Sequence, residues 1–115
     1  MTRNEVITFV GQIKPHEFEN EILLRWLDEL EKKISVEIHQ KYTRTDGFEG
    51  LLPDQLMVPS PYDRVYWTYL VAMIDFVTGS DELYERSIAA FKESYGEYAR
   101  AVQRAGGCRK KRSLI

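Results

Sequence analysis

The chain has 115 residues, of which 43% are hydrophobic and 30% charged, which is typical of one soluble globular domain and excludes a disordered chain. Its most apolar stretch, residues 65–77, is interrupted by Thr68 and Asp75 and is too short to span a bilayer. The single cysteine, Cys108, excludes an internal disulfide and favours a reducing compartment, and no signal-peptide pattern opens the sequence.

Charge is distributed unevenly along the chain. Residues 1–99 contain ten Lys and Arg and all eighteen Asp and Glu, which gives a formal charge of −8. Residues 100–115 contain six Lys and Arg and no acid, which gives +6. The sequence therefore predicts an acidic body with a basic C-terminal tail.

Two helices are predicted in the first part of the chain. Thr2 and Glu5 have the spacing of a capping box, which indicates a short helix that ends between residues 11 and 15. A second helix is expected from residue 15 or 16 to about residue 42, because apolar residues recur there at spacings of three and four. These residues are Leu23, Trp26, Leu27, Leu30, Ile34 and Ile38.

Residues 43–60 are predicted to form a long loop. Gly47, Gly50, Pro53 and Pro59 interrupt any helical pattern there. The loop is nevertheless rich in apolar side chains, so the simpler expectation is that it folds back over the bundle. The alternative is that part of it is a docking surface for a partner chain. The candidate docking residues are Leu51, Leu52, Leu56 and Met57.

A third helix is predicted from Ser60, as its cap, to about Thr78, where Gly79-Ser80 ends it and caps the next helix. It is apolar around most of its circumference, which is typical of a central helix or an interface helix. Within it, Asp75 is expected to lie on a polar strip or to pair with an arginine.

A fourth helix is predicted from about residue 81 to residue 105, with Gly106-Gly107 ending it. Gly96 is expected to permit a close contact with another helix. Apolar residues form a sustained seam along this helix. The seam consists of Tyr84, Ile88, Phe91, Tyr95, Tyr98 and Val102.

Together these patterns predict an all-α fold: a small bundle of about four helices with one long loop between the second and third helices. Residues 1–106 would form this domain and residues 107–115 a flexible basic tail. The tail is expected to be an extended docking arm, and the alternative is a solubilising extension without a partner. Its candidate docking residues are Arg109, Lys110, Lys111 and Arg112.

Motifs for catalysis or metal binding are absent from the sequence. His16 and His39 are far apart and do not have metal-ligand spacing with Cys108. No Gly-rich phosphate loop or nucleophile elbow is present. We therefore expect no catalytic, cofactor-binding or metal-binding residues, and no enzymatic activity.

Two segments carry a resemblance to a known family. They are Leu-Arg-Trp-Leu-Asp-Glu-Leu at residues 24–30 and Leu-Met-Val-Pro-Ser-Pro-Tyr-Asp at residues 56–63, followed by a tyrosine-rich pair of helices. Over nearly its whole length the chain resembles small head–tail connector (neck adaptor) proteins of tailed phages and prophages of Gram-positive bacteria. One departure is residues 84–92, which lack the asparagines that such proteins tend to carry there.

The resemblance implies a structural virion assembly protein, a subunit of a connector ring that joins portal and tail. Its partners would be further copies of itself, the portal and tail-proximal neck proteins, with non-specific proximity to DNA and with no membrane, cofactor or small-molecule substrate. It would occupy the host cytoplasm during assembly and then the virion neck. The alternative function is a nucleic-acid-binding accessory protein, whose six tail cations contact phosphates although the acidic body opposes it.

Overall fold

The computed structural model describes residues 1–114, and the side chains as far as residue 105. The elements are α1 (Arg3–Ile13), α2 (Asn20–Ile34), η1 (Ser35–His39), α3 (Gln40–Tyr42), α4 (Arg64–Thr78) and α5 (Asp81–Leu114). Because α2, the π-helical turn η1 and α3 follow one another without a gap, the fold has four helices. The part of the chain so described contains no strand beyond one isolated bridge between Thr2 and Gln55. The all-α prediction is confirmed.

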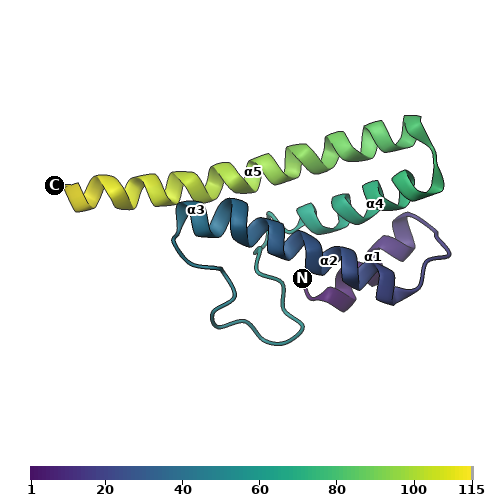
Figure 1. Ribbon diagram of the computed structural model, residues 1–115, viewed down its shortest axis with the longest axis horizontal. Helices are drawn as coiled ribbons and strands as arrows, with labels where there is room; N and C mark the ends of the chain where they lie inside the picture. Colours follow the sequence, from purple (N-terminus) through teal and green to yellow (C-terminus); the bar gives the residue numbers. More distant parts are fainter. Residues whose placement is uncertain (115) are drawn as a thin grey trace.

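The molecule is elongated, with dimensions of 54 × 31 × 20 Å. Figure 1 shows α5 running the whole length, with α4 antiparallel beside it and with α1 and α2 against the other side of α4. The loop between α3 and α4 hangs at the lower edge of this view, near the N-terminus. The predicted long loop between the second and third helices is therefore present.

Local sequence sets two helix ends as predicted. Thr2 Oγ1 accepts a hydrogen bond from the Glu5 amide at 3.2 Å, and Glu5 Oε1 accepts one from the Thr2 amide at 2.9 Å. This reciprocal pair is the predicted capping box of α1. At the end of α4, Gly79 has a φ of 82°, a left-handed conformation that glycine adopts without steric strain.

The second helix begins later than predicted, at Asn20 instead of residue 15 or 16. The Phe18 amide donates to His16 Nδ1 at 3.1 Å, and the Phe18 ring packs edge-on against Trp26 with centroids 5.6 Å apart. These contacts stabilise a non-helical connection between Lys14 and Glu19. Glu17 and Glu19 therefore precede the first turn of the helix, whereas Glu21 lies within it.

The third helix also begins later than predicted, at Arg64 instead of residue 60. The preceding residues form a turn in which the Tyr62 amide donates to the Pro59 carbonyl oxygen at 2.9 Å. Asp63 lies at the N-cap position without a side-chain capping bond, and its carboxylate instead pairs with the N-terminal amine of Met1 at 3.6 Å.

The predicted end of the last helix at Gly106-Gly107 is wrong, since α5 continues to Leu114. A glycine inside a helix costs about 1 kcal/mol relative to alanine but does not by itself end the helix. Residues 107–114 are thus helical instead of extended. The side chains of the tail docking residues lie outside the described part, so their docking role stays a prediction.

One core joins the four helices and the loop. The α4–α5 pair makes the most extensive contact of any two elements, as the seam and the apolar third helix predict. The expected close helix contact at Gly96 is wrong, because a β-carbon there would meet only the Arg100 guanidinium of the same helix. The core residues are Val6, Ile7, Val10, Leu23, Leu27, Leu30, Ile34, Ile38, Leu56, Met57, Val58, Val65, Tyr66, Leu70, Ile74, Phe91 and Tyr98.

Candidate docking interface

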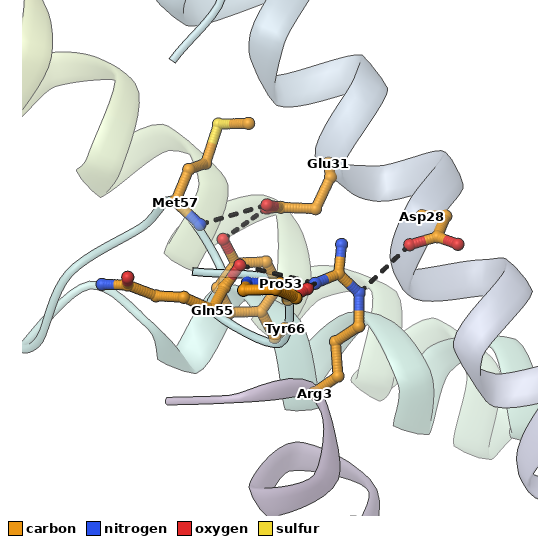
Figure 2. A network of polar contacts seen from close by, with 7 residues as sticks. All are labelled: Arg3, Asp28, Glu31, Pro53, Gln55, Met57 and Tyr66. Carbon is orange, nitrogen blue, oxygen red and sulfur yellow. Dashed lines mark hydrogen bonds and ion pairs between the residues drawn. The ribbon is translucent and has the colours of Figure 1, made fainter. Parts of the chain in front are cut away.

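Arg3 fastens the tip of the loop to α1. Its amide donates to the Asp54 carbonyl oxygen at 3.0 Å, and its guanidinium donates to the carbonyl oxygens of Pro53 at 3.1 Å and Gln55 at 3.4 Å. The same guanidinium pairs with Asp28 of α2 at 3.2 Å (Figure 2). One side chain therefore ties the loop to two helices.

A buried glutamate holds the next loop residues. Glu31 of α2 is 2% exposed and accepts hydrogen bonds from the Met57 amide at 3.1 Å and from the Tyr66 hydroxyl at 2.5 Å. The Tyr66 oxygen in turn accepts a hydrogen bond from the Val58 amide at 2.9 Å (Figure 2). Burial raises the pKa of Glu31, and burial beside Glu31 raises that of Tyr66.

These anchors bear on the first interpretation of the loop, that it folds back over the bundle. Leu56 is 3% exposed, Met57 is also buried and Leu51 is half-buried, so the loop folds back over the bundle. Leu56 and Met57 belong to the subunit's own core and are 3% and 8% exposed, and a docking role for them stays a prediction. Leu52 has free surface, because its side chain is 71% exposed.

The anchoring predicts a difference in hydrogen exchange within the loop. The amides of Met57 and Val58 donate to buried side chains and should exchange slowly in the free protein. The exposed segment around Glu49 should exchange faster. Measurement by mass spectrometry would test this, and equally fast exchange at residues 57–58 and at residues 44–50 would contradict the anchored loop.

A groove of about 620 Å³ opens where the loop passes α1. Leu52 and Pro59 give its lining exposed apolar surface, Leu56 and Val58 line it but are buried, and the side chains of Glu5 and Asp54 are exposed. Hydrogen bonds from Thr2 lower the pKa of Glu5, which keeps it anionic. The complete lining is Met1, Thr2, Glu5, Leu52, Pro53, Asp54, Gln55, Leu56, Val58 and Pro59.

Comparisons with known proteins add no relative. No family model, curated protein or solved structure matches this chain.

A second buried carboxylate joins three parts of the bundle. Asp75 of α4 is buried and pairs with Lys14 Nζ at 2.6 Å. It also accepts a hydrogen bond from the Ser87 hydroxyl of α5. The cationic partner is thus a lysine beyond the end of α1, where the sequence suggests an arginine or an exposed strip. Its contacts link α1, α4 and α5.

His39 lies where the loop leaves the helical bundle. Its Nε2 is 2.7 Å from the Tyr98 hydroxyl of α5, and burial lowers the pKa of His39 although Asp46 opposes this shift. Burial also raises the pKa of Tyr98 to about 12, so both partners are neutral near pH 7.

The neutral His39 predicts a loss of stability in acid. Its folded-state pKa is below the ordinary 6.5, so protonation favours the unfolded chain. The contribution of neutral His39 to the free energy of unfolding should be fully present above about pH 6.5 and be lost as the pH falls through the folded-state pKa. Chemical denaturation between pH 7.5 and pH 5 should show less loss for His39→Gln than for the wild type. An unchanged slope in the His39 variant would contradict the assignment.

Gly47 approaches His39 closely. Gly47 has a φ of +84°, and a β-carbon there would lie 2.8 Å from the His39 ring nitrogen Nδ1. Gly50 has a similar φ of +80° but no atom within 4 Å of such a β-carbon. Gly47→Ala should therefore destabilise the fold more than Gly50→Ala, which carries only the backbone strain of about 1–2 kcal/mol. Equal melting temperatures for the two variants would show that the close approach has no energetic weight.

The described residues contain neither a cluster of metal ligands nor a membrane-spanning helix. Among them, no three His, Cys, Asp or Glu side chains lie close enough together to hold a metal ion. None of the helices in that part of the chain has the length and apolarity needed to cross a membrane. The polar clusters described above bind the protein's own backbone and side chains.

Proposed function

We propose that this protein is a structural subunit of a phage head–tail connector, which joins portal and tail in the virion neck. The observation that carries the proposal is the length of α5, a 34-residue helix whose C-terminal end extends beyond the other helices (Figure 1). A helix in water is stabilised mainly by packing of its apolar face, so a projecting helix end favours a protein that completes its packing in an assembly.

The segments that carry the family resemblance support the same proposal. Val58 is fully buried, and its amide is held by Tyr66. Tyr62 of the same segment packs on Tyr98 of α5 with ring centroids 5.8 Å apart. In the other segment, Leu27 and Leu30 are core residues. Connector proteins that carry the same two segments are therefore expected to have the same anchored loop and the same α4–α5 pair.

Exposed apolar side chains also favour an assembly role. Phe76, Val77 and Leu83 gather around the turn between α4 and α5, and Phe76 is 61% exposed. At the loop, Leu52 lines the groove and is 71% exposed. Apolar surface of this kind is typical of subunits that bury it against neighbours.

A genetic experiment tests the proposal. In the phage or prophage that encodes the chain, portal and capsid genes should lie beside its gene. Deleting the gene should yield DNA-filled heads and separate tails, because the joint between them is missing. Complementation with the wild-type gene should restore joined particles. Intact infectious particles from the deletion strain would contradict the proposal.

Binding of nucleic acid is the second candidate function, favoured by the six cations and no acid in residues 100–115. It predicts that the isolated protein binds duplex DNA with an affinity that falls steeply with salt concentration. Binding that is absent at low salt would exclude it.

A further inference from the structure

The groove between α1 and the loop has the features of a binding site for a peptide segment. Its lining is mainly apolar, and both acidic or basic side chains among the lining residues, Glu5 and Asp54, are carboxylic acids. The N-terminal amine at its edge pairs with Asp63. Its volume of about 620 Å³ is in the range of pockets that hold a small ligand or several side chains.

The sequence of the chain's own C-terminus is complementary to this groove. Four consecutive cations, residues 109–112, are followed by Ser113 and then by the aliphatic pair Leu114 and Ile115. Cations beside Glu5 and Asp54 and aliphatic residues against the exposed apolar lining would match both properties of the groove at once. Residues 100–115 are also the only part of the chain with a strong positive charge, whereas the body carries −8.

The same molecule cannot supply this segment to its own groove. Helix α5 continues to Leu114, and 34 residues at 1.5 Å each extend about 51 Å, close to the full 54 Å length of the molecule. Its last turns project past α3, whereas the loop and the N-terminus lie below the bundle (Figure 1). Helix α5 therefore leads away from the groove of its own molecule.

We propose that the groove binds the C-terminal segment, residues 106–115, of a second copy of this chain. The contact pairs two different surfaces, so it is heterologous and repeats from copy to copy. Such a contact generates a ring if the rotation closes. This inference rests on the proposed function, which it deepens by naming the surfaces through which neighbouring connector subunits join.

The single cysteine allows a direct test with the full-length protein. Cys108 lies inside the proposed arm, so a benzophenone maleimide attached there reports what the arm contacts. Irradiation should produce covalent dimers, and mass spectrometry should map the cross-links to residues 1–5 and 52–59. Cross-links confined to other surfaces of the body, or a protein that stays monomeric at every concentration, would overturn the inference.

Sedimentation of groove variants tests the same contact without a label. Asp54→Lys and Leu52→Arg should each weaken self-association about tenfold or more, and Lys110→Glu should restore part of the affinity to Asp54→Lys. The controls are Glu49→Lys, an exposed acid of the same loop outside the groove, and Val36→Arg, an exposed aliphatic residue of η1. Equal weakening by the controls and the groove variants would contradict the proposal.

The two proposals fail in different ways. If the arm cross-links only to portal protein in a mixture with it, the groove assignment is wrong and the connector function stands. If groove cross-links form but the protein never binds a portal, the connector function is wrong and the self-docking stands. If the arm instead protects duplex DNA and forms no protein cross-link, the self-docking inference is overturned.

Discussion

Replacing Phe91 with alanine should lower the free energy of unfolding by about 3–5 kcal/mol, a large part of the stability of a domain of this size. Phe91 is 7% exposed and lies between Tyr69 and Tyr95, with ring centroids 5.0 Å and 5.6 Å away. The truncation leaves a cavity between α4 and α5. These two helices make the most extensive contact in the fold. Urea unfolding followed by circular dichroism measures the loss.

The control for this variant is Phe76→Ala. Phe76 is 61% exposed and its ring packs beside Tyr84, with centroids 5.3 Å apart, so the same chemical change should cost about 1 kcal/mol or less. If both variants lose the same stability, the α4–α5 seam is not the centre of the core.

Replacing Glu31 with alanine should cost about 3 kcal/mol and loosen the loop. The change removes the acceptor of the Met57 amide and of the Tyr66 hydroxyl, and each buried donor left without a partner costs about 1–3 kcal/mol. Hydrogen exchange at residues 53–58 should rise together with the loss of stability. Glu29→Ala, two residues away on the exposed face of α2, should leave both measurements near the wild-type values.

The charge of Glu31 should make the folding stability depend on pH in the opposite direction to His39. Burial raises the pKa of Glu31 above the ordinary 4.5, so the folded state takes up this proton before the unfolded chain does as the pH falls. Ionised Glu31 therefore reduces stability above its folded-state pKa, and protonation should recover that stability as the pH approaches 4.5. Glu31→Gln should remove this dependence while it keeps an acceptor for the Met57 amide. A variant with the same slope as the wild type would contradict the shift.

The sequence alone predicts the elements whose determinants are local. The Thr2–Glu5 capping box and the left-handed Gly79 both depend on residues within one turn of the helix end, and both are as expected. The beginning of α2 could not be predicted in this way, because it depends on the packing of Phe18 against Trp26. The continuation of α5 through Gly106-Gly107 likewise departs from the local rule that glycine ends helices.

The loop anchor was predictable in principle from one residue. Glu31 lies four residues after Leu27 and three before Ile34, so it occupies a position on the apolar stripe of α2. An acid at a core position indicates buried hydrogen-bond donors, since an unpaired buried charge costs too much. Its partners, at positions 57 and 66, are too far along the chain to be identified from spacing.

Binding to the portal tests the central claim most directly. The full-length protein should be mixed with the portal ring encoded beside its gene, and the mass of the complex measured by mass photometry, with serum albumin as a non-binding control. The connector function predicts a discrete complex whose added mass is a fixed whole number of 13.5 kDa subunits per portal ring. A portal ring whose mass stays unchanged at saturating protein would contradict it.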